Sequence, residues 1–416
     1  LKQLEHYSAD HGCVIVMETK TGHVKAISNL GRAEDGTYYE TQNYAITESH
    51  EPGSTFKLVD LIAVLDDKKA DTSTVYDSKG GRIEYYGRSV KDSNGKGYGK
   101  ISLARGFELS SNTILVQSVY ESYKNNPKQF TDRINSYGLN KPLGLPIKGE
   151  GIPVIPQPGT NRWSGVALPW MAFGYGLSVT PLQTLTLYNA VANDGVMVKP
   201  IFVSEIKEWN KTIKKYNTEV INPKICSQEA LNKVQAVLEN VVKRGTGSKL
   251  YSKDFSMAGK TGTAQVNYKD KSKLYYASSF VGYFPANEPK YSCIVVVHKP
   301  NVAAGYYGAD VAGPVFKRIA QKIFTDSPST NHVKNIDAKV VSQESDYSNY
   351  YKKVEKEERI VPNVKGMSGM DAVALLENLG LKVKVIGAGK VKKQSLTSGQ
   401  AFNKNQTIII ELSWSN

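Results

Sequence analysis

The strand-like segments of this chain fall into two groups that lie far apart in the sequence. Residues 11–30 contain the runs "HGCVIVMET" and "HVKAISNLG", and the "KTG" between them predicts a hairpin turn. Strand-like runs return at "FSMAGKTGTAQV", "YASSFVGYFPA" and "KYSCIVVVHKP", and the helical run "AGPVFKRIAQKIF" follows them. Residues 54–255, in between, have a mainly helical pattern. We therefore expect a sheet in which the first strands meet the last, with a helical domain inserted between them.

The last fifth of the sequence has a different organisation. Residues 326–358 are polar, charged and poor in apolar side chains, which predicts a linker. Residues 359–416 then form a compact pattern, in which Ser368 and Asp371 make a capping box before the helical run "AVALLENLG". The alternating strands "LKVKVIG" and "QTIIIEL" follow. We predict a large domain at 1–325, a linker and a small α/β domain.

The composition is that of a folded, basic protein. Lys and Arg number 53 against 39 Asp and Glu, which gives a formal net charge of +14. Such a charge favours an anionic neighbour, such as nucleic acid, a phospholipid surface or an anionic polymer. Because the lysines are scattered and no nucleic-acid-binding motif is present, we expect no nucleic acid partner.

The cysteines and the chain ends add few constraints. Cys13 and Cys293 lie in apolar strand-like runs, so the cysteines are predicted to be buried small side chains. No cysteine or histidine spacing resembles a metal site, and we expect neither a metal nor another cofactor. No run approaches the roughly 18 apolar residues of a membrane span. Since the chain begins at Leu1 rather than at Met, we expect it to be part of a longer protein.

The stretch "EPGSTFKLVDLIAVL" places a serine and a lysine one helical turn apart. Pro52 and Gly53 interrupt the preceding chain, so Ser54 is expected at the N-terminus of an amphipathic helix. Lys57 would then stand beside the buried stripe of that helix, where desolvation lowers the pKa of its amine. A neutral amine can deprotonate a serine, and the free N–H groups of the helix start can stabilise an oxyanion.

A serine three positions before a lysine is also common by chance. The same spacing occurs at Ser93–Lys96 and at Ser204–Lys207, but neither of these pairs opens an apolar helix. Taken alone, the pair Ser54–Lys57 is equally compatible with a helix cap and a surface lysine.

Two further motifs favour a catalytic interpretation. "ELSSNT" places the hydroxyl of Ser110 and the amide of Asn112 together at the start of a helix, although ordinary capping would explain the same residues. In "AGKTGTAQV", strand alternation places Lys260 and Gly262 on one face, and Thr261 and Thr263 on the other. A glycine allows a substrate backbone to approach, and an extended peptide can pair along such a strand. The alternative is a plain hairpin strand with a glycine bulge.

The order S-x-x-K, S-x-N and K-T-G resembles the signature of penicillin-binding proteins and serine β-lactamases. "EPGSTFK" and "GKTGTAQ" are most similar to class B penicillin-binding proteins, the monofunctional peptidoglycan D,D-transpeptidases, and "FGYGLSVTPLQ" is similar to a spacer motif of that family. Within that stretch, Thr180 and Gln183 predict a capping box with a structural role. Residues 359–416 resemble one PASTA domain. The resemblance implies an α+β transpeptidase fold, an antiparallel sheet with helices on both faces and an inserted helical subdomain. The lone C-terminal PASTA domain favours a role in cell division.

The same resemblance implies roles for the motif residues. Ser54 would be the acylated nucleophile and Lys57 its base. Ser110 would relay a proton to the leaving amine, Asn112 would bond the substrate or Lys57, and Lys260 would tune Ser110. The substrate-binding residues would be Thr261, Gly262 and Thr263, with the backbone N–H groups of Ser54 and Thr263 as the oxyanion hole.

Several functional alternatives remain open at this stage. A D,D-carboxypeptidase would use the same residues with water as acceptor, and a non-catalytic β-lactam sensor or cell-wall-binding protein would be acylated without turnover. A β-lactamase is disfavoured because the pattern E-x-x-L-N does not occur. The resemblance implies peptidoglycan stem peptides, lipid-linked precursors and β-lactams as ligands, and a membrane glycosyltransferase and division proteins as partners. It implies the extracytoplasmic face of the bacterial cytoplasmic membrane, in the periplasm, with an N-terminal anchor outside this sequence.

Overall fold

The computed structural model describes residues 1–209, 211–268, 270–326 and 359–413. The chain divides into two compact units, one within residues 1–328 and the other within residues 329–416. The linker expected at 326–358 lies, apart from its first residue, outside the described residues.

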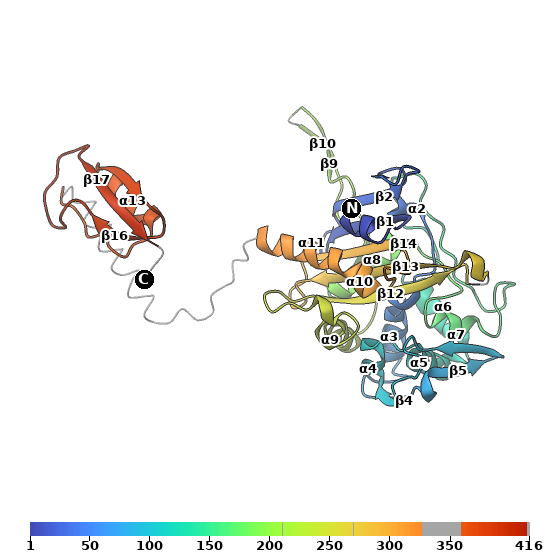
Figure 1. The fold of residues 1–416 in the computed structure, drawn as a ribbon. Helices are drawn as coiled ribbons and strands as arrows, with labels where there is room; N and C mark the ends of the chain where they lie inside the picture. Colours follow the sequence, from blue (N-terminus) through green and yellow to red (C-terminus); the bar gives the residue numbers. More distant parts are fainter. Residues whose placement is uncertain (210, 269, 327–358, 414–416) are drawn as a thin grey trace. The chain divides into compact units, whose positions relative to one another are not determined.

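A six-stranded sheet forms the centre of the first unit (Figure 1). Its strands follow the order β12-β13-β14-β1-β2-β3, and every neighbouring pair is antiparallel. The central pairing joins β1 to β14 and sets Val14 opposite Val295, so the prediction that the first strands meet the last is confirmed. The strands are β1 His11–Glu18, β2 Val24–Arg32, β3 Tyr38–Tyr39, β12 Ala258–Val266, β13 Tyr275–Phe284 and β14 Tyr291–His298.

Helices cover both faces of this sheet because its central strands are apolar on both faces. Along β1, Ile15 and Met17 join the larger core, which contains α3 and α8, whereas Val16 joins the smaller core, which contains α11. The helices of the unit are α1 Lys2–His6, α2 Tyr44–Thr47, α3 Lys57–Asp66, α4 Leu103–Glu108, α5 Asn112–Tyr123, α6 Pro127–Ser136, α7 Ala167–Met171, α8 Pro181–Ala192, α9 Gln228–Arg244, α10 Gly308–Val311 and α11 Gly313–Asp326.

The section between the two groups of strands is helical, as predicted, but it also contains short two-stranded sheets. Helices α3 to α7 gather below the central sheet in the view of Figure 1. The capping box predicted at Thr180 and Gln183 begins α8, with both of its hydrogen bonds formed. The additional strands are β4 Val75–Asp77, β5 Arg82–Tyr85, β6 Arg88–Lys91, β7 Lys100–Ser102, β8 Met197–Val198, β9 Glu205–Glu208, β10 Lys211–Lys215 and β11 Val220–Asn222.

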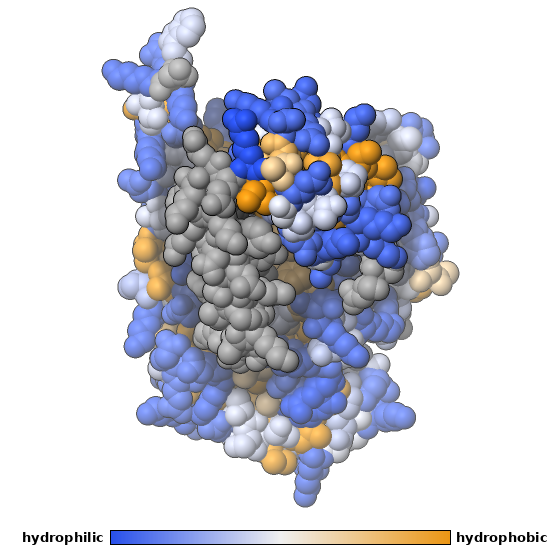
Figure 2. Space-filling view, turned by 90° about the vertical axis from the view of Figure 1, so that its left-hand side faces the viewer, coloured by the Kyte–Doolittle hydropathy of each residue, from blue (hydrophilic) through white to orange (hydrophobic). Residues whose placement is uncertain are grey.

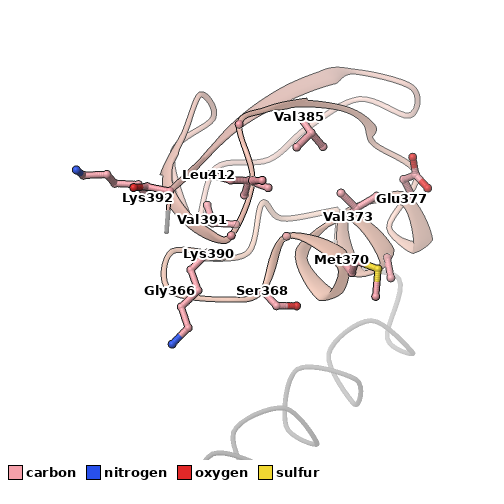
Figure 3. Close-up of a pocket in the computed structure, with 16 residues that line it drawn as sticks. Gly366, Ser368, Met370, Val373, Glu377, Val385, Lys390, Val391, Lys392 and Leu412 are labelled. Carbon is pink, nitrogen blue, oxygen red and sulfur yellow. The ribbon is translucent and has the colours of Figure 1, made fainter. Parts of the chain in front are cut away.

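The second unit is a small α/β domain with its own apolar core. Helix α13 Gly369–Asn378 packs on a sheet of order β15-β17-β16, formed by Lys382–Ile386, Thr407–Ser413 and Lys390–Gln394. Ser368 caps α13 by accepting a hydrogen bond from the Asp371 N–H, as the sequence predicted. An open pocket lies between α13 and the sheet, and Figure 3 shows Met370, Val373 and Leu412 among its lining residues.

The face of the molecule seen in Figure 2 is largely polar. Hydrophilic residues predominate on the face shown in Figure 2, with apolar residues in small groups. Within the described ranges, every helix is too short or too polar to cross a lipid bilayer.

Candidate active site

Ser54 lies in a tight turn that leads into helix α3. The turn Gly53–Thr55 is a 3-10 helix, and α3 itself starts at Lys57, so Ser54 precedes the α-helix instead of beginning it. Gly53 has a φ of 55°, a left-handed conformation that glycine adopts without strain. The hydroxyl of Tyr188 donates a 2.8 Å hydrogen bond to the Thr55 carbonyl, which fixes the turn to α8.

The ammonium or amine of Lys57 is fully buried beside this turn. Its Nζ lies 2.6 Å from Asn112 Oδ1, 2.7 Å from the Ser110 carbonyl oxygen and 3.3 Å from Ser110 Oγ. Burial lowers the pKa of Lys57 to about 7, although the carboxyl groups of Asp92 and Asp60 partly oppose the shift. A lysine with this pKa is neutral in a large fraction of molecules at neutral pH, as a general base requires.

The backbone conformation between Ser110 and Asn112 directs their oxygen atoms towards Lys57. Ser111, not Ser110, caps helix α5, because its side chain accepts from the Ile114 N–H. Ser110 is therefore not used as a cap, and it has a φ of 57°, which is unusual and costly for a residue other than glycine. This conformation places both its carbonyl and its hydroxyl within hydrogen-bonding distance of Lys57.

Strand β12 is the edge strand of the sheet beside this turn. The N–H of Gln265 donates to the Tyr175 hydroxyl at 2.7 Å, so it points away from β13. Since alternate residues of an antiparallel strand direct their N–H groups to the same side, the N–H of Thr263 also points away from β13. This open edge can accept an extended peptide as an added strand.

Gly262 has a structural role in addition to the one expected. A Cβ at this position would lie 2.2 Å from Ser279 Oγ and 2.8 Å from Thr55 Cγ2. The absence of a side chain therefore allows β12 to approach the turn that contains Ser54, and the expected approach of a substrate backbone stays a prediction.

The remaining residues of the K-T-G motif differ in burial. Lys260 is fully buried and donates to the Thr261 carbonyl at 3.1 Å, and burial together with the charge of Lys57 holds the pKa of Lys260 well below its ordinary value. No hydrogen bond joins Lys260 to Ser110 within the described residues, so its expected effect on Ser110 stays a prediction. The Thr261 hydroxyl lies 2.7 Å from that of Thr246, and the partly exposed Thr263 accepts from the Gly308 N–H at 3.1 Å.

The three motifs thus converge, and the chance occurrences of the first motif do not. Ser93, Lys96, Ser204 and Lys207 are all exposed, away from any apolar helix face. In the described part of the chain, no hydrogen bond yet links the Ser54 hydroxyl to Lys57. Such bonds often form only when a substrate is present.

Sequence reasoning missed several residues that position the site. Gly174 accepts at its carbonyl from the Gly53 N–H at 3.1 Å, and a Cβ on Gly174 would lie 2.0 Å from the Gly53 oxygen. Asp92 accepts from Ser111 and from Thr113 at the start of α5. The two glycines in "FGYG" were a visible signal for the first contact, whereas nothing local distinguished Asp92.

Comparison with known proteins agrees with this geometry. Residues 12–321 match the family model "Penicillin binding protein transpeptidase domain", and residues 359–413 match the model "PASTA domain". Stage V sporulation protein D of Bacillus subtilis is 27% identical over 423 residues, covering 98% of this chain and 61% of that protein. Peptidoglycan D,D-transpeptidase FtsI of Escherichia coli is 29% identical, covering 75% of this chain and 50% of that protein.

A solved structure has the same fold. The crystal structure of penicillin-binding protein 3 from Mycobacterium tuberculosis, complexed with aztreonam, superposes with a TM-score of 0.67 at 25% identity, covering 78% of this chain and 75% of that chain. The present chain spans between half and about three-fifths of the length of the two curated relatives named above. By the match over residues 12–321, this chain belongs to the penicillin-binding protein transpeptidase family, and it contains a PASTA domain.

Proposed function

We propose that this chain is a serine D,D-transpeptidase that cross-links peptidoglycan stem peptides through an acyl-enzyme on Ser54. The observation that supports the proposal most strongly is Lys57, a fully buried amine with a pKa of about 7. It lies one turn after Ser54 and within hydrogen-bonding distance of Ser110 and Asn112.

The proposed reaction uses each group in turn. A donor peptide ending in D-Ala-D-Ala pairs with the open edge of β12, and Thr261 and Thr263 bind its terminal carboxylate. Ser54 Oγ attacks the carbonyl carbon of the penultimate D-Ala while its proton passes to Lys57. The N–H groups of Ser54 and Thr263 hold the oxyanion.

The tetrahedral intermediate then collapses to the acyl-enzyme. The amide C–N bond breaks, and the terminal D-Ala leaves with a proton that Ser110 relays from Lys57. An amine of a neighbouring stem peptide next attacks the ester and gives up a proton, and Ser54 is restored. In this scheme Asn112 orients Lys57, and Lys260 is the group that can adjust the Ser110 hydroxyl.

The wider setting follows from the substrate. We propose that the enzyme acts at the extracytoplasmic face of the membrane, where peptidoglycan is assembled, beside a glycosyltransferase and division proteins. The name of the E. coli relative, a peptidoglycan D,D-transpeptidase, supports a role in peptidoglycan synthesis. We also propose the division into a transpeptidase domain at 1–325, a linker at 326–358 and a PASTA domain at 359–416.

Mass spectrometry of the intact protein with benzylpenicillin tests the nucleophile. We expect one covalent equivalent, mapped to the peptide that contains "EPGSTFK", and none in Ser54→Ala. Ser93→Ala and Ser204→Ala are matched controls that should label like the unaltered chain. Labelling that persists in Ser54→Ala would refute the assignment.

Two measurements distinguish a transpeptidase from the related activities: the lifetime of the acyl-enzyme, and the acceptor with which the acyl-enzyme reacts. A transpeptidase should keep the penicillin adduct for many minutes, a barrier above roughly 20 kcal/mol, because we expect a site built for an amine acceptor not to activate water. Release within seconds with accumulating hydrolysed penicillin would indicate a β-lactamase. With a D-Ala-D-Ala donor, a product that forms only with an added amine indicates transpeptidation, hydrolysis alone indicates a carboxypeptidase, and acylation without turnover indicates a sensor.

A further inference from the structure

Three of the six histidines of the sequence lie together at one end of the central sheet. His11 at the start of β1 pairs across the sheet with His298 at the end of β14, and their rings stack with centroids 4.4 Å apart. The ring of His50 meets that of His298 edge-on at 4.9 Å. A carboxylate completes the group, because Glu48 Oε2 lies 2.7 Å from His11 Nε2 and 3.6 Å from His298 Nε2.

The burial of His298 is unexplained without a further partner. The residue is only 2% exposed, and neither of its ring nitrogens has a hydrogen-bond partner among the described residues. A neutral imidazole has one N–H donor and one acceptor, and leaving both unsatisfied in the interior is costly. His298 also offers one of three ligand-type atoms, with His11 and Glu48, that all lie within 4.8 Å of one another.

From this arrangement we infer that His11, Glu48 and His298 form a binding site for a divalent transition-metal ion of the Zn²⁺ class. Two imidazoles and one carboxylate are a ligand set that Zn²⁺ accepts, with metal–ligand distances of about 2.0–2.2 Å. Those distances require neighbouring ligand atoms to be about 3.3 Å apart in a tetrahedral site. The observed 2.7 and 3.6 Å lie on either side of that value, but the two imidazole rings are stacked nearly parallel, so one ring must turn before both Nε2 lone pairs point at the ion.

The surroundings of His11 also match those of a metal ligand. Its other ring nitrogen, Nδ1, lies 3.0 Å from Asp10 Oδ2. Metal-binding histidines usually donate their second N–H to a carboxylate, which fixes the tautomer and orients the ring. The side chains of His11 and Glu48 are 13% and 26% exposed, so an ion can enter and solvent can supply a fourth ligand.

The ion would have a structural effect on the chain that leads to the nucleophile. Glu48 follows helix α2, and the segment from Glu48 to His50 continues to the turn of Ser54. A metal bound by β1, β14 and Glu48 would fasten this segment to the sheet. The competing arrangement is a protonated His11 that donates to both Asp10 and Glu48. In that arrangement neither ring nitrogen of His298 has a hydrogen-bond partner among the described residues.

Metal binding can be measured without reference to enzymatic activity. The full chain, prepared without a polyhistidine tag and stripped with a chelator, is titrated with Zn²⁺ alone against a chromophoric competitor. We expect one tight equivalent and a rise in the melting temperature that EDTA reverses. In Glu48→Gln and in His11→Gln the affinity should fall by more than about 100-fold, because each variant removes a direct ligand.

The control is His23→Ala, which removes the histidine of another pair, His23 with Glu18, at the opposite end of β1. This variant should bind Zn²⁺ like the unaltered chain. Circular dichroism and melting in EDTA establish that each variant is folded, and Co²⁺ absorption of the unaltered chain reports the ligand geometry independently of any substitution. The site is refuted if the unaltered chain binds no tight equivalent, or if Glu48→Gln and His11→Gln bind as tightly as it does.

Discussion

At the scale of single residues, the site depends on ionisable groups taken out of water. Lys57 is fully buried, and three oxygen acceptors surround its Nζ. One helical turn further, Asp60 is equally buried, and neither of its carboxylate oxygens has a hydrogen-bond partner among the described residues. Burial disfavours the charged form of each group, so it lowers the pKa of the lysine and raises that of the aspartate.

The first residue-scale prediction concerns the protonation of Lys57. Because acylation needs the neutral amine, the rate of penicillin acylation should rise with pH and level off above about pH 8, given a pKa of about 7. Lys57→Arg retains a cation that cannot deprotonate, and it should lose acylation by a factor of at least about 100. Stopped-flow acylation across pH measures both effects. A folded Lys57→Arg variant that acylates at the normal rate would exclude the role of base.

The second residue-scale prediction concerns Asp60 and stability. Since the pKa of Asp60 is raised in the folded state, the native chain retains a proton that the unfolded chain has lost, and this group makes stability fall as pH rises above about 4. Asp60→Asn removes that ionisation. It should therefore stabilise the protein at pH 8 by about 1–3 kcal/mol and have little effect at pH 4.

Asp66, at the end of the same helix, provides a control of opposite sign. Although burial opposes it, hydrogen bonds from Ser227 and the charge of Arg133 lower the pKa of Asp66. Its stabilising contribution is present above the unfolded pKa of about 4 and is lost as pH falls through the folded value. Asp66→Asn should thus destabilise the protein at pH 8. Urea unfolding of both variants at the two pH values checks the pair, and the same sign for both would contradict the assignment.

At the scale of secondary-structure elements, the site is a junction between a turn, a helix and a strand. The turn Gly53–Thr55 contacts β12, and Tyr188 of α8 donates a hydrogen bond to the Thr55 carbonyl in that turn. The glycines at positions 174 and 262 are what allow the backbones to come this close. Helix α5 then presents Asn112 to Lys57 across the interface.

The element-scale prediction is that Gly262→Ala separates β12 from the turn. The new methyl group would contact Ser279 Oγ and Thr55 Cγ2 at distances far below van der Waals contact. We expect a loss of about 1–3 kcal/mol in stability and a lower acylation rate. Adding Ser279→Ala removes Ser279 Oγ, the nearer of the two atoms, and should restore part of the lost stability and part of the lost acylation rate. Melting curves and acylation rates of the single and double variants test this, and an unchanged acylation rate in Gly262→Ala would contradict it.

At the scale of the whole molecule, the chain consists of two units with separate cores. The two cores of the first unit lie on the strands and helices around the site, whereas the core of the second unit is formed by residues such as Val364, Leu376 and Ile408. Each unit therefore contains the apolar contacts that its own folding needs.

The prediction at this scale is that the second unit is dispensable for acylation. Deleting residues 330–416 should leave the penicillin acylation rate within about twofold of that of the full chain, because the residues of the site all belong to the first unit. Ile408→Asp, which places a charge in the core of the second unit, is a matched full-length variant with the same expected result. Collapse of acylation in a folded, truncated chain would contradict the independence of the units.

Much of this arrangement follows from local sequence patterns. Alternation and turn residues located β1, β2 and the strands from β12 to β14, and the spacing of polar and apolar residues located α3 and the caps of α8 and α13. These predictions succeed because strand and helix periodicity is encoded within a few residues of each position. The short strands β4 to β11 were missed, since two- to five-residue strands leave too little periodicity to detect.

The tertiary structure alone decided the state and the partners of the chemical groups. The sequence by itself determined that Ser54 and Lys57 stand one turn apart and that the first and last strands share a sheet. It could not determine that Ser111 rather than Ser110 caps α5, so that Ser110 can contact Lys57. Nor could it determine that Gly262 lies against the turn of Ser54, or that His11 lies beside Glu48 and His298. The physical reason is that burial, pKa and close contact depend on residues brought together from distant parts of the chain, whereas helix and strand formation depends on neighbours in sequence.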